Sequence, residues 1–331
     1  MTTPSGQISL DQVNVELDIS PGTQINMNAP AVRGLAEVPS GAISMSNLQG
    51  KSNAQFIVAS GGNTTTTSGD FKIHTFTSSG TFTVSQAGNA AGSNTVEYLV
   101  IAGGASGGSD GGGGGGSGGY REVFPVPATG GLSVSATGFP ITVGAGASAQ
   151  SGKSQGQAGS PSTFSSITSA GGGLGGLQGQ GGGNGGSGGG GGARGGSAGS
   201  GNNPPVSPSQ GNNGGAGNGS QDTPSDKGGG GGGAGGAGGS ATSGAAGGNG
   251  QASSISGSSS NRAGGGGGGG GPGGPGPANT PSGSTAGGQE SGPTSGNASA
   301  NTGSGSGGGG MDNRLSGSGG SGLVIIRYKF Q

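Results

Sequence analysis

The sequence predicts a mainly β and otherwise non-regular fold, with short N-terminal helices, a small β base and a glycine-rich bundle of polyproline-II-like helices. Three observations predict this fold class. Glycine accounts for 97 of the 331 residues and only 25% of the residues are apolar or aromatic, which excludes one ordinary hydrophobic core. Strand-like alternation recurs between residues 56 and 168 and again at the C-terminus. Between these two regions the chain has almost no large side chains.

These changes in composition divide the chain into four segments. Residues 1–55 form a helical segment, and residues 56–168 form a β-strand base with the first glycine-rich stretches. Residues 169–316 form the glycine-rich bundle with polar loops, and residues 317–331 form the closing strand of the base.

Short helices are expected in the N-terminal segment. Ser9 and Gln12 fit a capping box, which starts a helix with apolar residues on one face. Pro30 suits the first turn of a second helix, and a third short turn is expected at residues 44–49.

About 55 residues with few large apolar side chains lie at the lower limit of independent folding. The N-terminal segment is therefore either a small accessory domain or a docking segment whose apolar faces are completed by a partner. We favour docking, and we expect these side chains to take part in it: Leu10, Val13, Leu17, Val32, Leu35, Met45 and Leu48.

Alternating residues predict the strands of the base. Residues 71–77 and 81–84, joined by a turn at Ser79-Gly80, predict a hairpin. The apolar run within residues 322–330 suits a strand covered on both faces, and we expect it to pair with the strand 96–101. This pairing would bring both ends of the glycine-rich region onto one base. Weaker strands are expected at 120–126, 132–134 and 140–143.

Side-chain burial cannot fold the glycine-rich region, because residues 165–311 contain only six residues of the types Val, Ile, Leu, Met, Phe and Tyr. Ordering each residue costs about 1–2 kcal/mol, and glycine loses the most freedom. Glycine chains in the polyproline-II conformation lack Cβ atoms, so neighbouring chains can approach closely and pair N–H with C=O groups. A flexible Gly/Ser linker is the alternative.

Several stretches resemble a known family. They are Phe76-Thr-Ser-Ser-Gly-Thr-Phe-Thr-Val84, Val96-Glu-Tyr-Leu-Val-Ile-Ala-Gly-Gly104, Gly118-Gly-Tyr-Arg121, Ile141-Thr-Val-Gly-Ala-Gly146 and Gly319-Gly-Ser-Gly-Leu-Val-Ile-Ile-Arg-Tyr328. Their order resembles that in glycine-rich domains of tailed-bacteriophage fibre and adhesin proteins, over about residues 70–331. In some of these adhesins, packed polyglycine-II helices carry loops that contact the host surface. The stretches 9–17, 31–36 and 40–52 look like a short module of phage virion proteins that attaches to the particle.

The resemblance implies a virion structural protein, namely a tail-fibre or adhesin-tip subunit that recognises and adsorbs to the host surface. The expected partners are tail, baseplate or fibre proteins, bound through the N-terminal segment, and a host cell-surface glycan or outer-membrane protein. A homo-oligomer is an option, and the expected location is the virion, after assembly in the host cytoplasm. The alternatives are a head fibre or capsid decoration protein, and a non-viral structural or ice-binding glycine-rich protein.

Polar loops between the glycine runs are the expected receptor-binding sites. These loops are 202–208, 220–227, 253–262 and 279–302. The residues expected to contact the receptor are Asn202, Asn203, Val206, Gln221, Asp222, Lys227, Arg262, Asn279, Gln289 and Glu290.

No enzyme activity, catalytic residue, cofactor or metal is expected. The resembling family carries no catalytic motif, and the chain has no Cys and a single His, which removes Cys/His metal sites. A net charge of −1 gives no reason to expect nucleic acid, and the longest apolar runs are too short for membrane insertion.

A P-loop-like stretch, the single histidine and three aspartates are not expected to form functional sites. In the P-loop-like stretch 146–154, five residues separate the glycines where four are needed, which indicates a chance match. His74 is expected on a sheet surface rather than as a general base. Asp110, Asp222 and Asp226 are expected to be solvated turn residues, because their spacing does not match an EF-hand.

Overall fold

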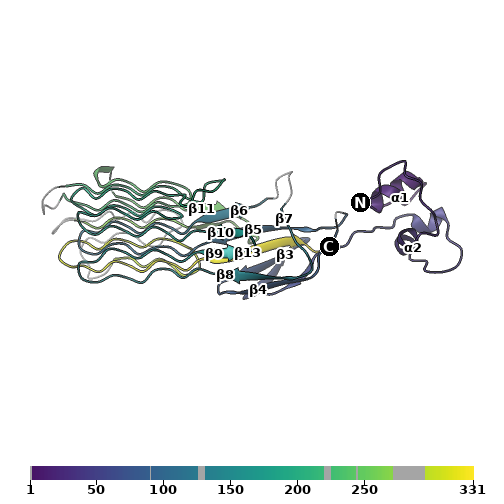
Figure 1. The fold of residues 1–331 in the computed structure, drawn as a ribbon, viewed down its shortest axis with the longest axis horizontal. Coiled ribbons are helices and arrows are strands. Elements are labelled where there is room, and N and C mark those ends of the chain that lie inside the picture. The colour runs from purple at the N-terminus through teal and green to yellow at the C-terminus, as the bar shows by residue number, and fades with distance from the viewer. Residues whose placement is uncertain (1, 90, 126–130, 220–224, 244, 271–294) are drawn as a thin grey trace.

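A computed structural model describes residues 2–89, 91–125, 131–219, 225–243, 245–270 and 295–331. The molecule is elongated, and three parts follow one another along its long axis (Figure 1). The N-terminal helices lie at one end, the β-sheets lie in the middle, and extended glycine-rich segments form the other end. We call these segments, residues 102–119, 143–161, 170–219, 225–243, 245–250, 263–270 and 295–322, the glycine array.

The N-terminal helices form where the sequence predicts them. Helix α1 (Leu10–Glu16) begins at Ser9, whose hydroxyl accepts the amide hydrogen of Gln12 in a complete capping box. Helix α2 (Pro30–Ala36) has its proline in the first turn. The third turn is the 3₁₀ helix η1 (Met45–Leu48).

Two antiparallel sheets pack face to face in the middle part. Within the described residues, the first sheet has the order β1 (Val58–Ser60), β4 (Gly80–Gln86), β8 (Gly138–Thr142), β9 (Ser162–Phe164) and β10 (Ile167–Ser169). The second has the order β2 (Thr64–Ser68), β3 (Phe71–Phe76), β13 (Leu323–Lys329), β5 (Thr95–Ile101) and β6 (Tyr120–Val123), with β7 (Leu132–Ser133) also paired to β5.

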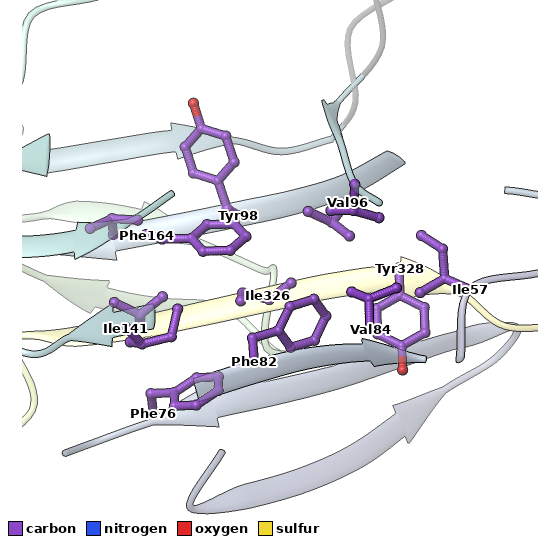
Figure 2. Close-up of a cluster of buried hydrophobic side chains, with 13 residues drawn as sticks. Ile57, Phe76, Phe82, Val84, Val96, Tyr98, Ile141, Phe164, Ile326 and Tyr328 are labelled. Carbon is purple, nitrogen blue, oxygen red and sulfur yellow. The ribbon is translucent and has the colours of Figure 1, made fainter. Parts of the chain in front are cut away.

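Aromatic and branched side chains from both sheets form the core between them (Figure 2). Phe82 of the first sheet packs with Tyr328 of the second, with 6.1 Å between ring centroids. Tyr98 of the second sheet and Phe164 of the first meet edge to face, with 6.3 Å between ring centroids. This core fixes one sheet on the other.

The expected pairing of the C-terminal strand with residues 96–101 is confirmed. Strand β13 lies between β3 and β5, and Ile325 is opposite Leu99. Its alternate residues contribute to two separate cores. Val324 belongs to the core between the sheets, whereas Ile325 packs on the outer face with Ile255 from the loop between β11 (Gln251–Ser253) and β12 (Ser260–Arg262). Strands β11 and β12 form a third, two-stranded antiparallel sheet.

The predicted hairpin of 71–77 with 81–84 is wrong. Strand β3 pairs with β2 and β13, whereas β4 pairs with β1 and β8 in the opposite sheet. Phe76 and Phe82 both belong to the core between the sheets, so the chain crosses from one sheet to the other at 77–79 and their side chains meet from opposite sides.

His74 is not on a sheet surface, as the sequence predicts, but is buried between the sheets with 1% of its surface exposed. Its Nδ1 donates to the Gly61 carbonyl oxygen at 2.6 Å, and its Nε2 lies 3.1 Å from the Tyr328 hydroxyl. The imidazole also stacks on the Tyr328 ring. Burial lowers the pKa of His74, against the Gly61 hydrogen bond that raises it.

The predicted fold class is corrected at the glycine-rich region. The described residues are mainly β, in three antiparallel sheets, with two short α-helices and the 3₁₀ turns η1 and η2 (Ala241–Ser243). They contain no bundle of polyproline-II-like helices. The predicted small β base is instead two packed sheets of five and six strands with a separate two-stranded sheet. The glycine segments are short and non-regular, because turns at 178–180, 185–187 and 193–195 divide what the composition presents as one run.

Backbone hydrogen bonds between segments distant in sequence join the glycine array. Gly114 illustrates the arrangement: its amide donates to Gly229 at 2.9 Å, and its carbonyl oxygen accepts from Gly190 at 2.8 Å. A Cβ on Gly114 would lie 2.1 Å from the carbonyl oxygen of Gly266. Three neighbouring segments therefore contact one residue, and two of them bond to it.

The first prediction concerns this close packing. Gly114→Ala should destabilise the protein by about 1–3 kcal/mol or more, because the added methyl group must push backbone apart. Gly236→Ala is the matched control, since its nearest neighbour would be 3.6 Å away. The control should be neutral or stabilising by about 0.4–1 kcal/mol. Thermal unfolding measures both, and equal midpoints would contradict the close packing.

The second prediction concerns His74. Its lowered folded-state pKa means that the unfolded chain binds the proton more readily, so stability is fully present above the unfolded pKa of about 6.5 and is lost as pH falls through the folded pKa. We expect His74→Gln to flatten this part of the stability–pH curve between about pH 7 and 5. Urea unfolding at a series of pH values measures the difference; parallel curves for both proteins would refute the assignment.

Candidate functional site

The turns of the glycine array gather at its two ends. At the end far from the sheets, a Cβ on Gly111 would touch the side chains of Met311 and Ala193. The amide of Arg194 donates to the carbonyl oxygen of Asn218 at 2.8 Å, which places a third turn beside them. We call this group, residues 109–112, 151–153, 178–180, 193–195, 218–219, 225–227 and 311–314, the distal turns.

Charged side chains are concentrated at the distal turns. All charged residues described within the glycine array lie there: Asp110, Lys153, Arg194, Asp226, Lys227, Asp312 and Arg314. At a close approach such as Gly114 there is no room for a Cβ, and side chains buried inside the array, such as Ser117 and Ser187, are small and uncharged.

Asp110 organises part of the distal surface. It is 5% exposed, with a left-handed backbone at φ 53°, and so differs from the solvated turn residue that its sequence predicts. One carboxylate oxygen accepts the amide hydrogen of Asn313 at 3.1 Å, and the other lies 3.6 Å from Nζ of Lys153. Asp110 therefore ties three turns together.

A cleft of about 210 Å³ lies at the other end of the array, where it meets the second sheet. Strand β6 supplies Tyr120 and Glu122 to its wall. The remaining lining residues come from the loop before residue 211, from the turn at Ala234 and from β11; they are Pro208, Ser209, Gln210, Ala234 and Gln251.

Asn202 and Gln210 hold the loop that borders this cleft. The Asn202 side-chain oxygen accepts the amides of Val206 and Gln210, at 3.1 and 3.3 Å, while its Nδ2 donates to the Val206 carbonyl oxygen. Gln210 is buried, donates to Pro204 and accepts from the Ala170 amide. The loop is thus fixed by its own side chains.

A polar network surrounds Glu122, which lines the cleft. The Glu122 carboxylate accepts hydrogen bonds from the Tyr120 hydroxyl at 2.9 Å and from the Ser253 hydroxyl. Burial raises the pKa of Glu122, against the lowering effect of these two hydrogen bonds and of the positive charge on Arg262. Burial also raises the pKa of Tyr120 and lowers that of Arg262.

The structure separates the residues expected to bind a receptor. Asn202, Asn203 and Val206 lie in the loop beside the cleft, and Arg262 approaches the cleft from β12. Lys227 lies at the distal turns, where its amide donates to Asn218. The other predicted residues, Gln221, Asp222, Asn279, Gln289 and Glu290, fall outside the described residues.

The residues expected to dock mostly pack on one another instead. Val13, Val32, Leu35 and Leu48 form a buried cluster, and Leu17 and Met45 lie against it. Leu10, at 44% exposure, is the remaining apolar side chain of that set and points to solvent.

Sequence reasoning did not assign Glu122, Gln210 or Gln251 to a site. These residues are distant in sequence, and only the pairing of β5 with β6 and the path of the glycine array bring them together. The one available indication was a short polar stretch, Tyr120-Arg-Glu122, directly after a glycine run.

Within the described ranges, no three side chains of His, Cys, Asp or Glu are grouped to hold a metal ion. None of the described helices has the length and hydrophobicity to cross a membrane.

These features define a β-sandwich protein whose strands continue into a hydrogen-bonded glycine array. A family model described as a glycine-rich domain matches residues 76–329, which include most of the sandwich and the whole array. The match covers more than half of the chain, so the protein belongs to this glycine-rich domain family. No curated protein matches the chain.

The third prediction tests the loop beside the cleft. Asn202→Ala removes the acceptor of two amides and should destabilise the protein by about 1–3 kcal/mol. Amide exchange at Val206 and Gln210 should become faster. Asn203→Ala is the matched control, because Asn203 is exposed and no side-chain hydrogen bond is described for it. Hydrogen exchange measures both variants, and unchanged protection in Asn202→Ala would contradict this account.

Proposed function

We propose that this protein is a phage virion structural protein, a tail-fibre or adhesin-tip subunit that recognises the host surface without catalysis. The observation that carries the proposal is the placement of the charged distal turns at one end of the molecule and the N-terminal helices at the other (Figure 1). Such a molecule can be held at one end and present polar side chains at the other.

The glycine array supports presentation because its segments bond to one another. A flexible linker would let its turns move independently, whereas here Asp110 and the backbone bonds hold several turns in a fixed arrangement. A fixed arrangement lowers the entropy cost of binding. The proposed receptor is a host cell-surface glycan or outer-membrane protein.

Attachment to the particle is proposed for the N-terminal unit, through its surface rather than its core. The buried cluster is already complete, so a partner would contact the exposed Leu10 and a hollow of about 280 Å³ beside α1. Thr2, Pro4, Gln12 and Val15 are among the residues that line this hollow.

The fourth prediction tests adsorption. In particles that carry the variant protein, Lys153→Ala with Arg194→Ala should slow adsorption at least about tenfold, since each charged hydrogen bond contributes about 1.5–3 kcal/mol. Lys72→Ala in β3 is the control, which removes a positive charge far from the distal turns. Adsorption assays compare the rates for the unmodified particles, the double variant and the Lys72→Ala control.

Equal adsorption by all of these particles would contradict the assignment of the distal turns. Immuno-labelling of particles tests the location: label at the tail agrees with the proposal, and label on the head would replace it with a head-fibre or decoration role.

A further inference from the structure

The cleft between β6, the 202–210 loop and β11 has features that the distal turns lack. It is concave and has a fixed border, with a volume of about 210 Å³. Pockets for drug-sized ligands usually measure about 300–1,000 Å³, so this cleft suits a smaller molecule or one unit of a chain.

Its lining combines hydrogen-bonding groups with small apolar surfaces. Glu122, Ser209 and Gln251 offer a carboxylate, a hydroxyl and an amide. Tyr120, Pro208 and Ala234 add an aromatic ring, a pyrrolidine and a methyl group. A pyranose ring presents the matching pattern, since its hydroxyl groups donate and accept while its C–H faces are apolar.

The charges at the cleft favour a neutral ligand. The Glu122 carboxylate lies near the Arg262 guanidinium, and each acts electrostatically on the other. An anion would meet the carboxylate, and a cation would meet a carboxylate that already has two hydrogen bonds and a nearby guanidinium. Glu122 lines the cleft and Arg262 does not, so a ligand meets the carboxylate first, and a hydroxyl group can donate to the remaining lone pairs of Glu122.

The cleft is also organised before any ligand arrives. Asn202 and Gln210 fix one side through the hydrogen bonds described above, and Ser253 links the β11–β12 sheet to Glu122 on the other. A site with fixed walls binds more tightly than one that must first be ordered.

We propose that this cleft binds one neutral hexose unit of a glycan. The inference rests on the proposed host-surface function only for its biological setting, since the binding itself is a property of the purified protein. It assigns the glycan to the side of the molecule, next to the sandwich, and leaves the distal turns to make a second contact.

The experiment is saturation-transfer difference NMR on the full chain with four neutral probes: glucose, galactose, mannose and N-acetylglucosamine. At least one should receive saturation and bind with a dissociation constant near the millimolar range, about −4 kcal/mol. N-acetylneuraminic acid, which carries a carboxylate, should not bind. Absence of transfer to all four neutral sugars, or transfer to the acidic sugar alone, would overturn the proposal.

Variants place the binding at the cleft. Gln251→Ala should weaken the sugar about 2- to 10-fold, which is the loss of one hydrogen bond. Gln251→Trp should abolish binding, because the ring would cover the cleft at an exposed position. Gln180→Ala makes the same change at an exposed distal residue and should have no effect. Equal affinity in all three variants would overturn the site.

The outcomes separate this inference from the proposed function. Sugar binding with unchanged adsorption of the distal variants would retain the cleft and reject the distal turns. Loss of adsorption in the distal variants without any sugar binding would retain the distal turns and reject the cleft.

Discussion

Close contact between backbones that lack Cβ atoms is the constraint on which the structure depends. An amide hydrogen bond contributes only about 0.5–1.5 kcal/mol net, close to the cost of ordering one residue. The glycine array therefore needs nearly every amide to be paired and every neighbour to be in van der Waals contact. Gly114, bonded to Gly229 and Gly190 and packed against Gly266, shows both conditions at a single residue. A side chain at such a position would separate three segments at once.

The β-sandwich supplies what the glycine segments cannot, namely a defined register. Strands β5, β6 and β13 are each continuous with an array segment. The pairing of these strands therefore fixes the positions of the adjoining segments along the strand direction. Side chains fix that pairing: Val324, Ile326 and Tyr328 face the inner core, while Leu323 and Ile325 face the outer one. Since a slip of one residue would exchange these faces, the register is strongly specified at the sheet and is carried from there into the array.

Local chemistry in the sequence was enough to predict some elements and not others. The capping box at Ser9 and the buried strand β13 depend on patterns contained within a few residues, and both form as expected. The prediction of a hairpin at 71–84 was wrong because a turn between two alternating strands does not show whether the strands pair or face each other across a core. The position of His74 was predicted wrongly because alternation alone does not show that the first sheet, through Phe82, covers the face of β3 that carries His74. The glycine-rich region was predicted as helices because its composition does not show where turns divide it. The cleft was not predicted because its walls come from four distant parts of the chain.

The same constraint determines where this chain can carry recognition chemistry. A charged side chain needs space that a close backbone approach such as the one at Gly114 does not leave, whereas Ser117 and Ser187 are small enough to be buried inside the array. The charged residues described within the array lie at the distal turns, and the junction with the sheet carries the polar residues of the cleft. These two places differ in kind. The distal turns carry charged side chains, and the Asp110 carboxylate and backbone hydrogen bonds hold several of these turns together. The junction is concave, and its walls include Gln210, whose side chain also holds the Ala170 amide, and Glu122, which links β6 to the β11–β12 sheet through Ser253. Substitutions at the junction therefore affect the fold as well as the shape of the cleft.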